Sequence, residues 1–329
     1  MLAARLYGPH DLRLEDIEPP RPPEGWALIK SLAVGICGTD KAFYTGTYPL
    51  LKRPLVLGHE VVGKVVEGPE GLIDKLVVSE INFSCMKCSF CRMGLYTHCP
   101  HRKTLGIDFD GGMAEYFIAP LTSLHIVEGM DPIMAVEVEP LAAVLNMLEQ
   151  TPPSPQSKVA VIGSGNLAIL ILQILRNMNI ETVAIVRGDS PKRRYIESLD
   201  IETICTDKVE DYVAERTPEG MGFDMVIEAS GSTEALNLAI DITRPRGIIH
   251  LKSTPGAMFK VNMTKAVVKE LRVIGTRCGT FREFEKAIQM LREGIIKPII
   301  TTVVEGLAKA PEAFKMSLDR RQVKVVVKP

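Results

Sequence analysis

The sequence lacks a long hydrophobic run and carries almost no net charge. Its longest apolar stretch, LAILIL at residues 167–172, is far shorter than the roughly 20 residues that cross a bilayer. The 39 basic and 40 acidic side chains give a formal net charge of -1, so no basic field exists to attract nucleic acid or anionic lipid. Residues 1–20 contain no apolar core of the kind found in signal peptides. We therefore expect a soluble, cytoplasmic protein that binds neither nucleic acid nor membrane.

Cysteine is scarce outside one short segment, since residues 83–99 hold four of the seven cysteines. An odd number without a secretory signal favours reduced thiols with a metal or redox role. Gaps of two, two and seven residues suit the tetrahedral shell of zinc, and a closed four-sulfur shell leaves no position for substrate. An iron–sulfur cluster fits less well, because the ferredoxin run ends in a shorter gap. We predict a structural zinc lobe at about residues 83–103, with ligands Cys85, Cys88, Cys91 and Cys99.

Two sequence patterns divide the chain. The first 130 residues contain short β-rich runs broken by glycine and proline, which indicates a largely antiparallel domain. Residues 158–188 then read strand, glycine turn, helix, strand, and further alternation of strands and helices follows, which is typical of a doubly wound parallel sheet. The last fifty residues return to a helix and short strands. We predict an α/β protein with one domain at 1–140 and 278–329 and a second at 141–277.

A closed cysteine lobe requires that the chemistry lie elsewhere. Cys37 lies in a glycine-flanked bend, VGICGTD, and His59 and Glu60 lie in LGHE. With Glu139 in VEPLAAV, they supply the mixed donor set expected where zinc keeps an exchangeable position. Each residue alone is weak evidence for a metal site, because a single cysteine or histidine more often packs in the protein interior than binds a metal.

A glycine motif, GSGNLA at residues 163–168, connects the first strand and helix of the predicted parallel sheet. Gly163 permits a tight turn, and Gly165 lets the backbone approach a pyrophosphate at the helix N-terminus. Ala168 replaces the third glycine of the fingerprint, which tolerates it.

The residue after the second strand of that sheet bears on the choice of cofactor. NAD enzymes place an acid there to bind the ribose 2′-hydroxyl, but this chain has Arg187, which suits a 2′-phosphate. Lys192, Arg193 and Arg194 follow closely, although they also fit a solvated helix start, and Asp189 could still reach a hydroxyl. NADP is therefore favoured over NAD, and NAD stays open.

The motifs VGICGTD, GHEVVG, the four-cysteine lobe, GIDFDGGMAEYF, VEPLAAV and GSGNLA occur in this order along the chain. In kind and order they resemble the zinc-containing medium-chain dehydrogenases, the superfamily of alcohol, sorbitol, glucose and threonine dehydrogenases. The resemblance spans essentially the whole chain. It implies a GroES-like catalytic domain, completed by the C-terminal segment, and a Rossmann cofactor domain, in an enzyme that is a dimer or tetramer.

The resemblance also implies roles for individual residues. Cys37, His59, Glu60 and Glu139 would hold a catalytic zinc, Asp40 would orient His59, and Thr39 would relay a proton from the substrate hydroxyl. Many relatives continue the relay through a histidine where this chain has Ala42, so a water chain or Tyr44 are the alternatives. Two zinc ions per chain are expected. Expected cofactor contacts are Gly163, Ser164, Gly165, Asn166, Leu167, Arg187, Arg193, Arg194, Ser230 and Cys278.

Glu139 and the motif GIDFDGGMAEYF are similar to the corresponding features of the polyol, sugar and threonine dehydrogenase branches. Arg187 is similar to the residue found in the NADP-tolerant sugar enzymes. We expect a small-molecule substrate, a sugar or polyol, with threonine or a secondary alcohol and NAD as the alternative. The expected substrate pocket contains Thr39, Phe43, Tyr48, Asn82, Asp108 and residues near Cys278, although Phe43 and Tyr48 are equally plausible core aromatics. A zinc-stapled, nucleotide-sensing binding protein without catalysis is the alternative of another class. The lobe's few basic side chains lack interleaved aromatics, which disfavours it.

Overall fold

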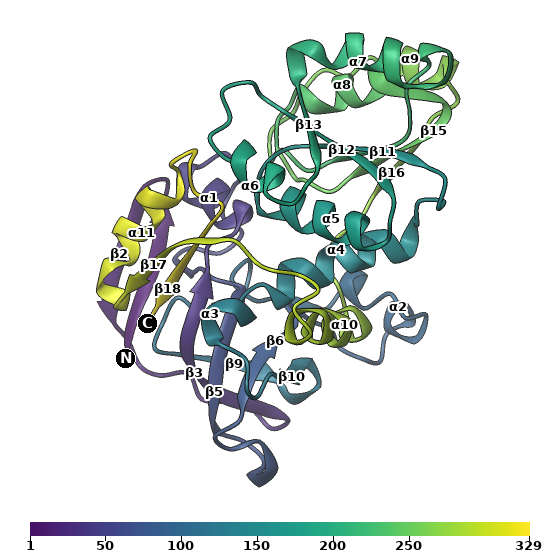
Figure 1. Ribbon diagram of the computed structural model, residues 1–329. Coiled ribbons are helices and arrows are strands. Elements are labelled where there is room, and N and C mark those ends of the chain that lie inside the picture. The colour runs from purple at the N-terminus through teal and green to yellow at the C-terminus, as the bar shows by residue number, and fades with distance from the viewer. The chain divides into compact units, whose positions relative to one another are not determined.

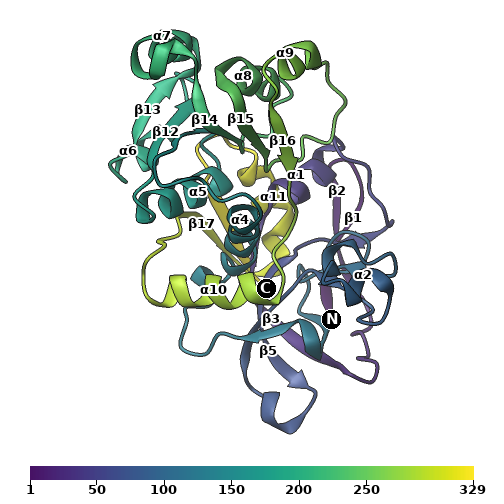
Figure 2. The ribbon, with the colours of Figure 1, turned by 90° about the vertical axis from the view of Figure 1, so that its right-hand side faces the viewer.

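The computed structural model describes residues 1–329, which form two compact units. The first comprises Met1–Leu145 and Cys278–Pro329, and the second comprises Asn146–Arg277. The first boundary falls inside helix α4 (Val138–Gln150), five residues beyond the boundary predicted at residue 140. Figures 1 and 2 show the ribbon from two directions.

The first unit is built on a seven-stranded sheet in the order β10-β6-β5-β3-β18-β17, with β9 also pairing with β3. The bounds of its strands are β3 (Trp26–Gly35), β5 (Glu60–Glu67), β6 (Leu76–Ser79), β9 (Tyr116–Pro120), β10 (Leu124–Ile126), β17 (Ile300–Glu305) and β18 (Lys324–Lys328). Along β3, Ala27, Ile29, Ser31 and Ala33 are buried, which is the period of two expected when one face of a strand covers a core. A three-stranded sheet of β2 (Asp11–Asp16), β1 (Leu2–Gly8) and β4 (Leu55–Val56) belongs to the same unit.

Strand β18 brings the C-terminal segment back into this sheet. It runs antiparallel to β3, with Val326 opposite Gly35 and Val327 opposite Val34, and parallel to β17. The segment between β17 and β18 contains helix α11 (Ala310–Ser317), whose Phe314 is fully buried in the same apolar core as Phe43. Residues more than 260 positions apart therefore share one core.

The second unit contains the predicted parallel sheet. Its order is β13-β12-β11-β14-β15-β16, and all five pairings are parallel. The strands are β11 (Lys158–Ile162), β12 (Glu181–Val186), β13 (Glu202–Cys205), β14 (Phe223–Glu228), β15 (Thr243–Leu251) and β16 (Arg272–Gly275). Val159, Ala160 and Val161 are all fully buried, as expected for a strand covered on both faces. Counted along the chain, this is the Rossmann order 3-2-1-4-5-6, which reverses direction between β11 and β14.

Helices cover both faces of the parallel sheet. Helices α5 (Asn166–Asn177) and α6 (Arg193–Glu197) lie on one face, and α7 (Val209–Arg216), α8 (Ala235–Ile242) and α9 (Met263–Val268) lie on the other (Figure 2). The α/β prediction is confirmed.

Candidate active site

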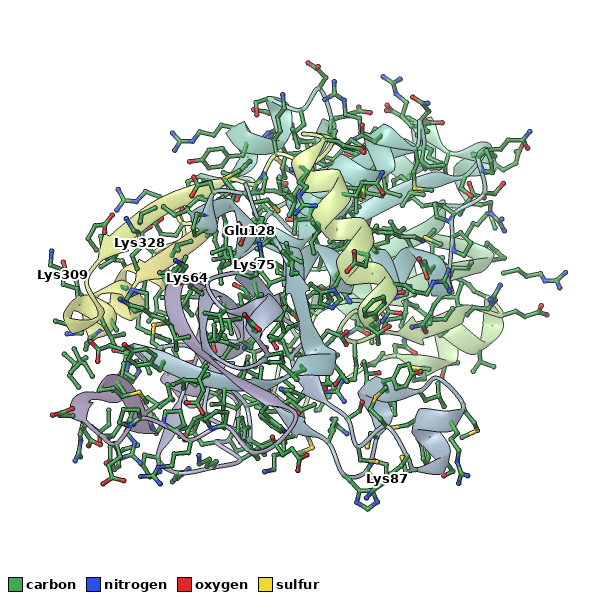
Figure 3. All side chains as sticks on the ribbon, turned by 90° about the horizontal axis from the view of Figure 1, so that it is seen from below. Lys64, Lys75, Lys87, Glu128, Lys309 and Lys328 are labelled. Carbon is green, nitrogen blue, oxygen red and sulfur yellow. The ribbon has the colours of Figure 1, made fainter.

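The four cysteines of the lobe lie together, and each keeps a free thiol rather than a disulfide. Their sulfur atoms all lie within 4.8 Å of one another, and the Sγ of Cys88 is 3.6 Å from that of Cys91 and 3.8 Å from that of Cys99. Four sulfurs at zinc–thiolate bond length around one ion would be about 3.8 Å apart. The lobe therefore has the donors and the spacing of a closed zinc site. Lys87 lies exposed on its surface (Figure 3).

The thiols of this lobe differ in acidity. A hydrogen bond from the backbone of Lys87 is the largest of the effects that lower the pKa of Cys85 to about 6. Burial is the largest of those that raise the pKa of Cys91 to about 11. Such a spread is expected when thiols crowd together, because one ionised sulfur opposes ionisation of the next.

A second donor cluster forms from Cys37, His59 and Glu60, whose ligand atoms also lie within 4.8 Å of one another. Sheet pairing explains their convergence, because Gly35 at the end of β3 lies opposite Glu60 at the start of β5. Cys37 follows Gly35 by two residues and caps the N-terminus of helix α1 (Gly38–Thr45). A β-carbon on Gly35 would collide with the Glu60 carboxylate, so a larger residue there would force that carboxylate to move.

Asp40 lies fully buried beside this cluster. Its Oδ2 accepts a hydrogen bond from the Cys37 N–H at 2.9 Å, and its Oδ1 lies 3.6 Å from Nδ1 of His59. Burial lowers the pKa of His59, but the charges of Asp40, Cys37 and Glu139 outweigh it and raise that pKa well above its usual value. A donor set with this excess of negative charge is one that a divalent cation would neutralise. The cluster therefore fits zinc.

Glu139, the fourth expected ligand, lies in the first turn of α4 and is 8 % exposed. It is close enough to raise the pKa of His59, but it is not part of the three-residue group within 4.8 Å.

Two buried residues near the cluster, Lys324 and Glu137, were not predicted from the sequence. Lys324 Nζ lies 2.5 Å from Oε2 of Glu60 and 3.6 Å from Oε1 of Glu137, and all three side chains are at most 2 % exposed. Burial lowers the pKa of Lys324, but Glu137 and Glu60 raise it well above its usual value. Glu60 is therefore shared between the donor cluster and an ammonium group. The only sequence signal was a lysine at the start of the largely apolar strand KVVVK.

The expected substrate residues differ in their surroundings. Thr39 lies half-buried in α1, two residues after Cys37. Asn82 is 5 % exposed, and both polar atoms of its side chain are without a hydrogen-bond partner. Asp108 accepts a hydrogen bond from the backbone N–H of Thr104, which gives it a local turn-stabilising role.

The aromatic residues near α1 belong to the core. Phe43 is fully buried, and its ring centre lies 5.5 Å from that of Tyr48. Tyr44, an expected alternative for proton transfer, is 2 % exposed and packs against Phe314. Cys278 begins the segment that returns to this unit and packs, partly buried, against the same core.

In the second unit, the glycine motif lies at the reversal point of the parallel sheet. Gly163 has φ +133°, and a β-carbon there would lie 2.8 Å from the carbonyl oxygen of Ala229 beside β14. A β-carbon on Gly165, which caps α5, would point into open space. The turn therefore leaves room for a ligand at the N-terminus of a 12-residue helix, and such an end attracts phosphate. The Ser164 hydroxyl lies 2.9 Å from that of Ser190.

The basic residues after β12 have different roles. Arg187 follows the strand directly and is exposed. Arg193 donates hydrogen bonds to Glu197 at 2.6 Å and to the Thr203 carbonyl at 3.2 Å, so its guanidinium is held against β13. Arg194 donates to the hydroxyl of Tyr195 at 2.9 Å. Of these three guanidinium groups, those of Arg193 and Arg194 are hydrogen-bonded to neighbouring residues, whereas that of Arg187 is exposed.

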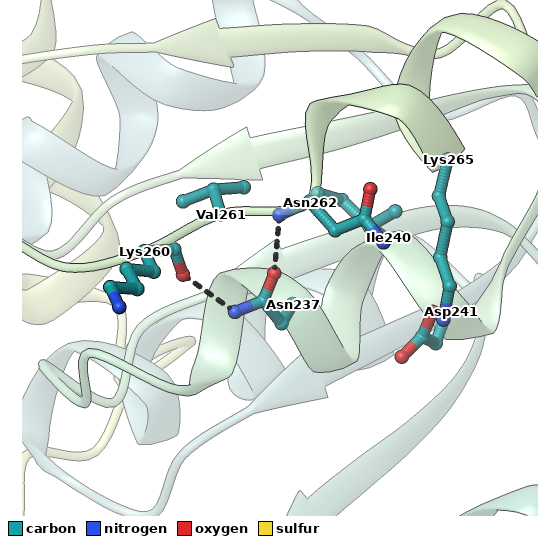
Figure 4. A pocket seen from close by; sticks show the side chains of 7 residues that line it. All are labelled: Asn237, Ile240, Asp241, Lys260, Val261, Asn262 and Lys265. Atoms are coloured by element: carbon teal, nitrogen blue, oxygen red, sulfur yellow. Dashed lines mark hydrogen bonds and ion pairs between the residues drawn. The ribbon is translucent and has the colours of Figure 1, made fainter.

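A separate open hollow of about 400 Å³ lies between α8 and α9 (Figure 4). The Asn237 amide bridges its rim, donating to the Lys260 carbonyl at 2.8 Å and accepting from the Asn262 N–H at 3.0 Å. Lys265 forms an ion pair with Asp241 beside it. None of the expected site residues lines this hollow. No helix in the structure has the length and apolar character of a membrane span.

Comparison with known proteins agrees with both units. The family described as "Alcohol dehydrogenase GroES-like domain" matches residues 23–129, and the family described as "Zinc-binding dehydrogenase" matches residues 167–293. The chain is 31% identical to a sorbitol dehydrogenase of Halalkalibacterium halodurans, over 100% of this chain and 98% of that protein. It is 29% identical to an L-threonine 3-dehydrogenase of Pyrococcus horikoshii, over 95% of this chain and 94% of the other.

A solved structure of a protein from Sinorhizobium meliloti 1021, described as a zinc-binding dehydrogenase bound to NADP, superposes with a TM-score of 0.87 at 27% identity. The match covers 100% of this chain and 99% of the other. The GroES-like and Rossmann folds implied by the sequence motifs are thereby confirmed. The chain belongs to the zinc-containing medium-chain dehydrogenase superfamily and is an oxidoreductase.

Proposed function

We propose that the enzyme transfers a hydride between the hydroxyl-bearing carbon of a sugar or polyol and NADP. The observation that carries the proposal is the convergence of Cys37, His59 and Glu60 in the first unit, with Glu139 nearby. One thiolate, one imidazole and carboxylates form the donor set of a zinc site that keeps an exchangeable position. The 31% identity to a sorbitol dehydrogenase supports a polyhydroxylated substrate.

The two donor clusters would hold two zinc ions per chain with different duties. The cysteine lobe would hold one ion in a closed shell that stabilises the fold. The Cys37 cluster would hold the other, with Glu139 as the further ligand. When bound, that zinc polarises the substrate oxygen, and the nicotinamide accepts or returns the hydride.

The chain's own residues position the donors and handle the proton. Asp40 accepts a hydrogen bond from the backbone N–H of Cys37 and would orient the imidazole of His59 through Nδ1. Lys324 holds the Glu60 carboxylate in place. Thr39 would relay the proton of the substrate hydroxyl, because its hydroxyl group would accept that proton while passing its own proton to a chain of water molecules or to Tyr44.

The glycine turn at 163–166 would bind the pyrophosphate of the cofactor, and Arg187 would pair with the 2′-phosphate of NADP. NAD is the second candidate cofactor. The 29% identity to an L-threonine 3-dehydrogenase is the observation that favours the second candidate reaction, oxidation of threonine or a secondary alcohol. We also propose that the enzyme is a cytoplasmic homo-oligomer, a dimer or tetramer.

A spectrophotometric screen of aldoses, polyols, threonine and secondary alcohols, each with NADP and with NAD, tests the proposal. We expect formation of the reduced cofactor with a polyol or aldose and NADP. Formation only with threonine and NAD would overturn both the substrate class and the cofactor. Elemental analysis of the purified enzyme should find two zinc ions per chain, and its oligomeric state should follow from light scattering.

A further inference from the structure

A buried polar network lies at the carboxyl ends of β14, β15 and β16. Glu228 is the last residue of β14, Lys252 follows the last residue of β15, and Thr276 follows the last residue of β16. In the parallel register Glu228 lies opposite Leu251, and Leu251 lies opposite Gly275. The three side chains therefore start from neighbouring positions on one edge of the sheet.

Glu228 joins two loops through its carboxylate and is 3 % exposed. Oε1 accepts hydrogen bonds from the backbone N–H of Ser230 at 2.7 Å and from its hydroxyl at 2.6 Å. The other oxygen, Oε2, accepts from the hydroxyl of Ser253. The loops that follow β14 and β15 are thereby held by a single negative charge.

Lys252 extends the network to the segment after β16 and is 7 % exposed. Its ammonium donates to the Arg277 carbonyl at 2.8 Å and lies 3.5 Å from the hydroxyl of Thr276, which is 2.9 Å from Nε2 of His250. Burial, followed by the charge of Lys252, lowers the pKa of His250 to about 4. His250 is therefore neutral near pH 7, and the buried charges of this network are those of Glu228 and Lys252.

The position of the network defines what binds above it. A dinucleotide lies across the carboxyl edge of a doubly wound sheet, with one nucleotide over each half. The glycine turn after β11 and Arg187 after β12 would take the pyrophosphate and the adenosine ribose. The nicotinamide nucleotide must then lie over β14, β15 and β16, where Glu228 and Lys252 are buried.

The charge of the nicotinamide ring changes in the reaction. The oxidised ring carries one positive charge, and the ring becomes neutral when a hydride, with its two electrons, is transferred to it from the substrate carbon. A nearby buried ammonium disfavours the oxidised form relative to the reduced form, and a nearby buried carboxylate has the opposite effect.

We propose that Glu228 and Lys252 are positioning residues that set the relative affinity of the enzyme for oxidised and reduced cofactor. They act through the three loops that they hold and through their opposite charges. The inference rests on the proposed function, because it requires nicotinamide cofactor in this half of the sheet.

Equilibrium binding without substrate tests the proposal. Dissociation constants for NADP⁺ and NADPH are measured separately by calorimetry on the unmodified enzyme and on the variants Lys252→Met and Glu228→Gln. We expect Lys252→Met to lower the ratio of the NADP⁺ to the NADPH dissociation constant about threefold to tenfold, and Glu228→Gln to raise it by a similar factor. Lys252→Arg, which keeps the charge, should give the original ratio.

The control is Lys265→Met, which removes a lysine from the exposed ion pair with Asp241 and should leave both constants unchanged. Thermal melting identifies any variant that is not folded, and the ratio is then read from the other charge-removing variant. Equal weakening of both cofactor forms in both variants would show a purely structural role and would overturn this inference alone. Failure of the unmodified enzyme to bind either nicotinamide form would overturn the proposed function as well.

Discussion

The two sulfur-containing clusters of the first unit are assembled in different ways. The four cysteines of the lobe all lie between residues 85 and 99, so a short stretch of chain contains the whole cluster. In the second cluster, Cys37 lies two residues beyond the end of β3, and His59 and Glu60 lie at the start of β5. Lys324 comes from a third strand, β18. A local cluster can stabilise its own loop, whereas a cluster built across a sheet depends on the whole domain and keeps carboxylates and an imidazole available for chemistry.

Replacing Cys37 should distinguish the roles of the two clusters most clearly. Cys37→Ser should lower kcat by at least about 1000-fold, because zinc-assisted polarisation of the substrate contributes several kcal/mol. The protein should stay folded and should keep one zinc ion per chain, which melting and elemental analysis would show. Cys205→Ser, a cysteine change outside both clusters, is the control. Unimpaired turnover by folded Cys37→Ser would refute the division of roles.

The opposite result is expected in the lobe. Cys88→Ser should lower the free energy of unfolding by several kcal/mol, on the order of what a structural zinc contributes, because the loop loses its ion. Denaturant titration measures this loss. The fraction that remains folded should keep near-normal kcat, and a stable but inactive variant would contradict this prediction.

Removing the buried ammonium should affect both properties. Lys324→Met removes the ammonium group that faces the buried carboxylates of Glu60 and Glu137, so we expect a loss of about 3 kcal/mol in stability together with reduced turnover. Lys324→Arg keeps the charge and should recover part of both. Full stability of Lys324→Met in urea titration would mean that the ion pairs contribute nothing to folding.

A smaller effect is expected in the second unit. Arg187→Asp should shift the ratio of NADP to NAD affinity about 10- to 100-fold towards NAD, because a carboxylate repels the 2′-phosphate and can accept a hydrogen bond from a hydroxyl. Arg193→Ala is the matched control, because that guanidinium is held by Glu197 and Thr203. Direct binding measurements with both cofactors decide the matter, and an equal shift in both variants would remove the distinction between the two arginines.

The smallest expected effect concerns the pH dependence of stability and involves His125, which lies outside both donor clusters. Burial lowers the pKa of His125, but hydrogen bonds with Glu80 and Glu285 outweigh it and raise the pKa above its usual value. Protonated His125 therefore stabilises the fold below its unfolded-state pKa of about 6.5, and this contribution disappears as pH rises through the raised folded-state pKa.

Unfolding free energies of the unmodified enzyme and of His125→Gln across this pH range measure that contribution. A flatter pH dependence in the variant is expected. An unchanged slope would assign the pH dependence to other groups, including those of the metal clusters.

The sequence predicts local features of this molecule better than distant ones. The lobe and the glycine turn depend on residues within one loop, so spacing and residue type were sufficient to identify them. Lys324 was missed because its partner Glu60 lies 264 residues away and a lysine in a strand is usually exposed. The hydrogen bond from Arg193 to Glu197 could have been anticipated, because the two residues are four positions apart in a helix.

The position of β18 has a consequence for the order in which the enzyme matures. Translation completes the cysteine lobe at residue 99, and under the proposed function that loop would then bind its zinc ion early in synthesis. The carboxylate of Glu60 must wait until Lys324 has been added, and until then no ammonium from β18 offsets the negative charge beside Cys37 and His59. Under the proposed function, the nascent chain would therefore complete the cysteine lobe long before the Cys37 cluster, and a newly made enzyme would stay inactive until its last strand has entered the sheet.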